Sequence, residues 1–131
     1  MLERFQSVQT LDAISSVAGP DEILNAQEAV EHVRMEANVR EYLLAIIAAT
    51  RTHAQLRLGA SPRASLGLQH AAQARAAIEG RDYVIPDDIK KMANPVLAHR
   101  VVIESSAGLR GRTRDNVISE ILGSVKVPIE R

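Results

Sequence analysis

Residues 57–63, with the sequence Arg-Leu-Gly-Ala-Ser-Pro-Arg, combine residue types that favour the binding of an anion. Ser61 suits the position before a helix because its hydroxyl can accept a hydrogen bond from a free backbone N–H, and Pro62 suits the first helical position, where no N–H is needed. Arg63 then lies in the first turn, beside uncovered N–H groups and the positive end of the helix dipole. Its guanidinium offers a planar set of donors that matches a phosphate group, so we expect an anion near Arg63.

Gly59 and Ala60 come directly before this helix start and have little or no side chain. We expect them to leave room for a large ligand to approach the backbone. The order of serine, proline and a charged residue is also common at ordinary helix starts, where the arginine is simply solvated. Spacing alone therefore leaves two interpretations of Arg63 open, an anion-binding residue and a solvated one.

The composition indicates one domain made of closely packed helices. The chain has 131 residues, about the size of a single domain, and 46% of them are hydrophobic. It contains one phenylalanine, two tyrosines and no tryptophan, so alanine and the aliphatic residues must fill the core. Such side chains suit helix packing better than a β-sandwich. The expected fold class is therefore all-α.

Charge and cysteine content argue against several classes of function. Sixteen Lys and Arg residues balance sixteen Asp and Glu residues, so the whole chain has no long-range attraction for nucleic acid or for an anionic membrane. The absence of cysteine removes disulfides, thiolate metal sites and thiol nucleophiles, and it favours a reducing compartment. The apolar run at residues 42–49 is far shorter than the about 20 residues that span a bilayer. We therefore expect a cytoplasmic protein without a nucleic-acid or membrane partner.

Hydrophobic periodicity predicts a compact bundle of about five helices with at most two very short strands. The predicted helices cover about residues 20–33, 37–53, 62–79, 86–94 and 113–125. Pro95 should break or kink the fourth of them around Asn94, because proline cannot donate to the carbonyl four residues earlier. Residues 105–112 contain two glycines and are predicted to form a loop. We assign residues 1–18 to a partly helical lead-in segment and residues 19–131 to the helical domain.

The apolar faces of the predicted helices should pack against one another. The residues expected on these faces include Ile23, Leu44 and Ile78. Gly80 should end the third helix, as glycines commonly do at the position after a helix, and Thr113 should cap the last one.

Most enzyme signatures are absent. No glycine-rich sequence ends in Gly-Lys-Ser or Gly-Lys-Thr, so the chain carries no P-loop of its own. The four histidines lack the spacing and the acidic neighbours of metal ligands, so we expect no metal site. Ser61 and Ser65 have no histidine close in sequence to act as a base, which speaks against a hydrolytic triad. Arg110, Arg112 and Arg114 alternate in the predicted loop, either as solvated residues or as a patch for an acidic partner.

Three blocks of sequence occur in the order and spacing of a known family. They are residues 57–65 (RLGASPRAS), residues 80–89 (GRDYVIPDDI) and residues 95–100 (PVLAHR). Over about residues 20–128 the chain closely resembles the C-terminal helical lid of MoxR-type AAA+ ATPases. Residues 1–4 are similar to the end of the linker that joins the nucleotide-binding core to this lid. The resemblance implies a longer protein whose AAA+ core is not part of this sequence.

In that family the Gly-Ala-Ser-Pro-Arg sequence is the sensor-2 motif. The resemblance implies that Arg63 acts in catalysis by reaching the terminal phosphates of ATP, which the P-loop of the core domain holds together with Mg. Arg57 is expected to contact a phosphate, the ribose or a backbone carbonyl. The residues implied in nucleotide binding are Arg57, Gly59, Ala60, Ser61, Pro62 and Arg63.

The resemblance also implies a ring-shaped homo-oligomer, commonly a hexamer, and a chaperone-like role, often with partners that contain a von Willebrand factor A domain. The full-length protein would hydrolyse ATP, whereas this chain alone would not, because it lacks the P-loop. Two alternatives stay open from the residues. The first is a stand-alone helical module that binds a protein or nucleic acid through Arg110, Arg112 and Arg114. The second is a structural lid in which Arg63 pairs with a carboxylate of its own fold.

Overall fold

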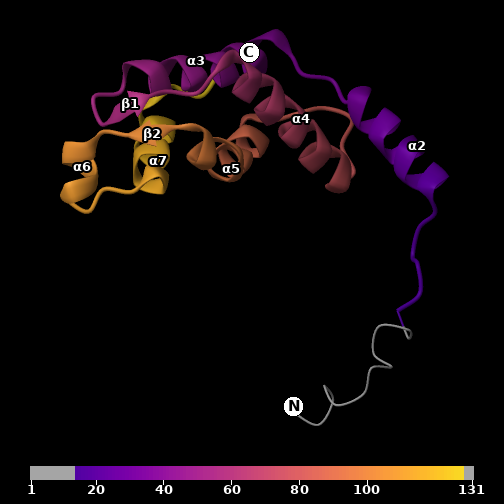
Figure 1. The fold of residues 1–131 in the computed structure, drawn as a ribbon. Coiled ribbons are helices and arrows are strands. Elements are labelled where there is room, and N and C mark those ends of the chain that lie inside the picture. Colours follow the sequence, from indigo (N-terminus) through magenta and orange to yellow (C-terminus); the bar gives the residue numbers. More distant parts are fainter. Residues whose placement is uncertain (1–13, 129–131) are drawn as a thin grey trace, which may run out of the picture.

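The computed structural model describes residues 14–128, and helices dominate it (Figure 1). In chain order its elements are α2 (Pro20–Glu31), α3 (Ala37–Thr52), β1 (Leu56–Leu58), α4 (Pro62–Ile78), α5 (Pro86–Leu97), the 3-10 helix η2 (Ala98–Arg100), β2 (Val102–Ile103), α6 (Ser105–Leu109) and α7 (Arg114–Ser124). This order confirms the predicted all-α bundle with two very short strands. Residues 14–19 are not helical, and the rest of the predicted lead-in segment, residues 1–13, lies outside the described residues.

Helices α3, α4, α5 and α7 enclose the hydrophobic core. α4 packs along α5, and both of these helices contact α3. Small residues on α4 let its neighbours come close, since Ala64, Ala72 and Ala76 are fully buried. The largest buried side chains come from all four helices and include Leu43, Ile46, Leu68, Ile89, Leu97, Ile118 and Ile121.

Strands β1 and β2 form a small antiparallel sheet. Leu56 lies opposite Ile103, and Leu58 lies opposite Val102, with an irregularity between the two pairs. Because the strands are antiparallel, the residues that follow Leu58 run beside those that precede Val102. The sheet therefore brings the segment before α4 next to the end of η2, although the two segments are far apart in the sequence.

Helix α5 does not break at Pro95, so the expected break, one of the two predicted effects of this proline, was wrong. The helix continues through Pro95 to Leu97, and η2 follows directly. Proline removes the N–H that would bond to the carbonyl of Lys91. Both Pro95 and Lys91 are exposed, so water can satisfy that carbonyl without a change in the helix.

Residues 105–112 were predicted to form a loop, but residues 105–109 of this segment form the short helix α6. The prediction was therefore wrong for this part of the segment. The side chain of Glu104 accepts a hydrogen bond from the N–H of Ser105 and so caps α6. Ala107 is buried at 1% exposure and holds this helix against the rest of the fold. Neither contact follows from periodicity, because α6 has only five residues.

Three apolar residues that were expected on packing faces are exposed instead. The exposed fractions are 51% for Ile23, 50% for Leu44 and 86% for Ile78. In α4 the buried face is turned toward Gln73, whose amide Nε2 donates to the carbonyl of Val33 at 2.7 Å. A polar residue thus occupies a core position because it satisfies a backbone carbonyl, and Ile78 is left on the outside.

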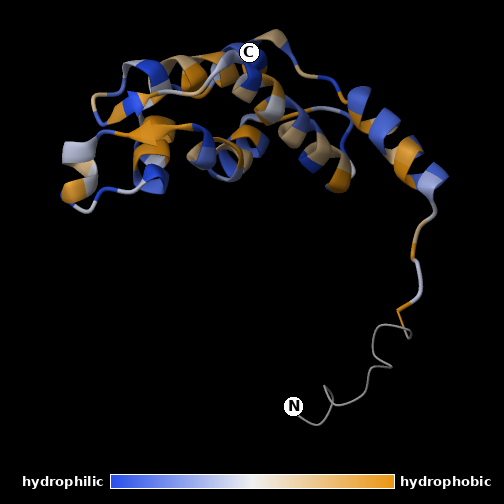
Figure 2. Cartoon of the chain, viewed as in Figure 1, coloured by the Kyte–Doolittle hydropathy of each residue, from blue (hydrophilic) through white to orange (hydrophobic). Residues whose placement is uncertain are grey.

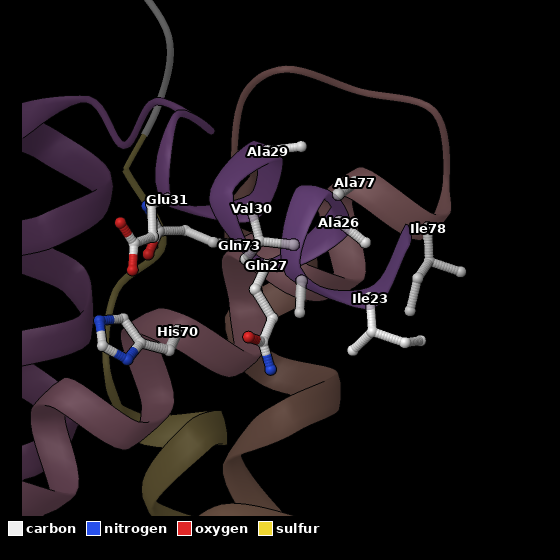
Figure 3. Close-up of a pocket in the computed structure, with 11 residues that line it drawn as sticks. Ile23, Ala26, Gln27, Ala29, Val30, Glu31, His70, Gln73, Ala77 and Ile78 are labelled. Carbon is white, nitrogen blue, oxygen red and sulfur yellow. The ribbon is translucent and has the colours of Figure 1, made fainter. Parts of the chain in front are cut away.

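Helix α2 lies against α4 but buries none of its own residues (Figure 1). Hydrophobic residues remain visible along it in Figure 2. Between α2 and α4 lies an apolar groove of about 690 Å³, bordered by Ile23 and Val30 from α2 and by Ala77 and Ile78 from α4 (Figure 3).

A buried carboxylate ties the start of α5 to the end of α4. Asp88 is 2% exposed, and Arg81 donates to both of its oxygens at 2.7 and 2.8 Å. The N–H of Ile85 donates to the same carboxylate at 3.0 Å. Burial alone would raise the pKa of Asp88, but these hydrogen bonds and the charges of Arg81 and Arg75 outweigh it and lower that pKa below its ordinary value.

Replacement of Asp88 by asparagine should lower the free energy of unfolding by about 2 kcal/mol, because the guanidinium of Arg81 loses its charged partner. Urea unfolding at neutral pH measures this change. The matched control is Asp87→Asn, since Asp87 is exposed and should change stability by less than about 0.5 kcal/mol. An Asp88→Asn protein as stable as this control would contradict the expectation.

The lowered pKa of Asp88 also predicts a dependence of stability on pH. In the folded state Asp88 binds a proton less readily than in the unfolded state. The ionised carboxylate of Asp88 therefore contributes fully to the free energy of unfolding above the ordinary aspartate pKa of about 4. This contribution is lost as the pH falls through the lower folded pKa. Wild type should therefore lose its stability advantage over Asp88→Asn in strong acid.

Candidate functional site

The loop at residues 59–61 is anchored to the last turn of α3. The hydroxyl of Thr50 accepts a hydrogen bond from the N–H of Ala60 at 2.9 Å and donates to the carbonyl of Ile47 at 2.6 Å. The Nε of Arg51 donates to the carbonyl of Ala60 at 2.9 Å. Both backbone polar groups of Ala60 are thus bound by α3, and Thr50 and Ala60 are buried. The backbone that leads into α4 is therefore held in place.

Gly59 allows the loop to pack directly on the backbone of α3. A Cβ atom at this position would lie 2.6 Å from the Cα of Arg51 and 2.6 Å from the carbonyl oxygen of Thr50. The missing side chain makes room for the backbone of α3, and Ala60 is buried against the same helix. The expectation that a ligand approaches the backbone of these two residues stays a prediction, and both residues line the pocket beside this loop.

Arg63 lies in the first turn of α4, after Ser61 as the capping residue and Pro62 at the helix start. The hydroxyl of Ser61 makes no capping hydrogen bond, contrary to the expectation from its type. Arg63 is exposed, and among residues 14–128 it has no carboxylate within ion-pair distance. In this part of the chain, the alternative of an arginine already paired within its own fold does not apply.

A pocket of about 460 Å³ opens beside the anchored loop. Its walls are formed by Arg51, Arg57, Arg100 and residues 58–62, and none of these residues is acidic. Arg57 is exposed on β1, where its charge borders the pocket. The pocket thus brings together the predicted residues Arg57 and 59–62 with two arginines that the sequence did not single out as site residues, while Arg63 lies on the adjacent helix turn.

The three alternating arginines of the predicted loop do not form one patch. Arg112 donates through Nε to the side chain of Gln55 at 2.9 Å and also pairs with Glu120. Arg110 and Arg114 are exposed. One of the three therefore ties the segment between α6 and α7 to the turn before β1 and to α7, which leaves fewer charges for an external partner than the sequence suggested.

No three histidine, aspartate or glutamate side chains within residues 14–128 come together as a metal site. The apolar groove between α2 and α4 is larger than the arginine pocket but contains none of the predicted site residues. The positive charges that could hold an anion border the arginine pocket instead, beside the loop before α4.

Comparison with known proteins decides the family. Residues 48–121, more than half of the chain, match the family model of the AAA lid domain. The chain belongs to this family. The matched part of the lid runs from the end of α3 to α7 and includes the anchored loop, the arginine pocket and Arg63.

Similar proteins place the lid in the MoxR type of AAA+ ATPases. Chaperone MoxR1 of Mycobacterium tuberculosis is 34% identical over 82% of this chain and 31% of its own length. The uncharacterized protein YeaC of Bacillus subtilis is 37% identical over 98% of this chain and 39% of its own length. A crystal structure of a presumed ATPase from Cytophaga hutchinsonii superposes with a TM-score of 0.86 at 26% identity, over 98% of this chain and 42% of that one. The lid thus spans well under half the length of these proteins.

Among the described residues of the lid, no helix is both long enough and apolar enough to cross a membrane.

Replacement of Thr50 by valine should lower the free energy of unfolding of the lid by about 2 kcal/mol. Valine keeps the shape of threonine but leaves the buried N–H of Ala60 without an acceptor. Urea unfolding measures the loss, and hydrogen exchange should show faster exchange at Ala60. Thr52→Val is the matched control, because Thr52 is exposed and should stay within about 0.5 kcal/mol of wild type. Equal stability of the two variants would contradict the anchoring role of Thr50.

Proposed function

We propose that this lid senses ATP bound by a nucleotide-binding core elsewhere in the same protein, and that Arg63 contacts the terminal phosphates. One observation carries the proposal: Arg63 is exposed in the first turn of α4, has no carboxylate partner within residues 14–128, and follows a loop that α3 holds rigid. A guanidinium presented in this way is available to a ligand from another domain. Helix N-termini and arginines both favour phosphate oxygens.

The relatives support a phosphate ligand that belongs to a nucleotide. The lid covers 31% of Chaperone MoxR1 and 42% of the presumed ATPase from Cytophaga hutchinsonii, so each of these proteins has ample further length for a core domain. In our proposal that core binds ATP and Mg through its P-loop and closes against the face of the lid that carries Arg63. Arg57 and the loop residues 59–62 complete the lid's side of the site.

Contact with the terminal phosphate makes the angle between core and lid depend on the nucleotide. Arg63 gains a partner when ATP is present and loses it after phosphate is released, so the closed arrangement is favoured by ATP. We extend the proposal to a chaperone-like role in a ring-shaped homo-oligomer, with proteins that contain a von Willebrand factor A domain as partners. The resemblance and the name of the mycobacterial relative support this extension.

Energy transfer between two fluorophores in the full-length protein tests the coupling. The lid contains no cysteine, so Lys91→Cys on the exposed side of α5 gives it a single labelling site, with the second dye in the core. ATP with Mg should change the transfer efficiency in the wild type. Arg63→Gln should abolish that change, and Arg114→Gln, an exposed arginine at the start of α7, should keep it. A full response in Arg63→Gln would overturn the proposed role.

A further inference from the structure

Four arginines gather at one end of the lid, and none of them has an acidic partner within residues 14–128. Arg51, Arg57 and Arg100 border the pocket, and Arg63 lies in the adjacent turn of α4. Among the described residues, the ion pairs of the lid involve other basic residues and none of these four. In a chain with sixteen charges of each sign, this is a local excess of positive charge. It favours a ligand with several negative charges.

Arg100 reaches this region from a distant part of the sequence. It ends η2, and the antiparallel pairing of β1 with β2 runs its segment beside the loop that follows Leu58. Its Nε donates to Nε2 of His99 at 3.1 Å, which fixes one edge of the guanidinium. The Nη1 and Nη2 groups make no hydrogen bond to any residue between 14 and 128.

The guanidinium of Arg100 lies against α4 at Gly67, which has no side chain in the way. A Cβ atom at Gly67 would lie 3.1 Å from Nη1 and 3.5 Å from Cζ of Arg100. Gly67 follows Arg63 by four residues, so both lie on the same face of α4, one turn apart. The guanidinium of Arg100 therefore rests on the helix face that carries Arg63, and the two cationic groups face a common region.

We propose that Arg100 is a second phosphate-binding residue of the lid, so that a polyphosphate is held by Arg63 from α4 and by Arg100 from η2. This inference rests on the proposed function, because it assumes that the region faces the phosphates of a nucleotide. Two guanidinium groups from separate elements match a chain of linked phosphates better than a single phosphate. A bound polyphosphate also connects the start of α4 to the end of η2, which directly follows α5.

Titration of the 131-residue chain with inorganic tripolyphosphate tests this inference. Two-dimensional NMR at low ionic strength gives the dissociation constant from the amide shifts of residues 59–61 and Arg63. Arg100→Gln and Arg63→Gln should each weaken binding about tenfold, since each removes charged hydrogen bonds to phosphate. Arg100→Lys should fall between Arg100→Gln and wild type, because lysine keeps the charge without the planar pair of donors. Arg114→Gln should change the constant less than twofold.

The outcomes separate the two proposals. Weaker binding in both Arg63→Gln and Arg100→Gln supports both. Weaker binding in Arg63→Gln alone overturns the role of Arg100 and leaves the proposed function standing, and the reverse overturns the role of Arg63. No effect in either variant overturns both. Arg100 and Arg63 are exposed, so thermal unfolding of the variants should match wild type and exclude misfolding as the cause.

Discussion

Replacement of Arg63 by alanine is expected to lower ATP turnover by the full-length protein about 100-fold. Arg63 accelerates the reaction only if its positive charge lies close to the negative charge that develops on the phosphate oxygens during phosphoryl transfer. The loop before α4 is already fixed by Thr50 and Arg51, so little reorganisation is needed when the ligand arrives. The loss should therefore appear mainly in kcat, with a smaller change in KM. Release of phosphate at saturating ATP measures it.

The same variant should leave the lid folded. Arg63 is exposed and has no carboxylate partner within residues 14–128, so its removal should change the free energy of unfolding by less than about 0.5 kcal/mol. Arg114→Ala is the matched control, since Arg114 also begins a helix and is exposed. Normal turnover in Arg63→Ala, or an equal loss in Arg114→Ala, would refute the assignment of Arg63 to the site.

Features that depend on neighbouring residues were predictable from the sequence. Pro62 begins α4 as expected, and Gly80 ends it with φ at 75°, a conformation that glycine adopts without strain. Thr113 caps α7, where its hydroxyl accepts from the N–H of Asn116. In each case the relevant partners lie within one helical turn, so residue type and spacing contain the needed information.

Features that join distant segments were not predictable in the same way. The bond between Gln73 and the carbonyl of Val33 spans 40 positions and turns the buried face of α4 away from Ile78. Asp88 occupies the first turn of α5, where acidic residues are common, yet Arg81 from the segment after α4 makes it part of a buried ion pair. Periodicity describes one helix at a time and cannot show which polar residue will find a partner on another element.

In the candidate site, too, the local features were predictable from the sequence and the contacts between distant segments were not. The position of Arg63 in the first turn of α4 followed from the serine and proline before it. The loop is anchored by Thr50 and Arg51, which lie ten and nine positions before Ala60. Nothing in the Gly-Ala-Ser-Pro-Arg sequence indicates these two residues. Arg100 comes from still farther away, brought in by the pairing of β1 with β2. The sequence therefore located the arginine, and the fold explains why it is held in place.

Replacement of Gly59 by alanine should lower the free energy of unfolding of the lid by about 3 kcal/mol. The new Cβ would lie 2.6 Å from the backbone of both Thr50 and Arg51, and a helix backbone cannot move aside as a flexible side chain can. The loop must then shift outward, which also weakens the hydrogen bonds that Ala60 makes to Thr50 and Arg51. In the full-length protein, turnover should fall as well, because the displaced loop carries Arg63 with it.

Gly123→Ala is the matched control for this change. Gly123 lies in α7, and apart from its chain neighbours and its own helix backbone no atom of the described residues comes within 4 Å of a Cβ placed there. Alanine at such a helical position should raise the free energy of unfolding by about 0.5 kcal/mol. The two variants add the same methyl group and should therefore move stability in opposite directions, which urea unfolding can resolve. If Gly59→Ala also stabilises the lid, the loop is not packed on α3 as described, and the rigid presentation of Arg63 loses its basis.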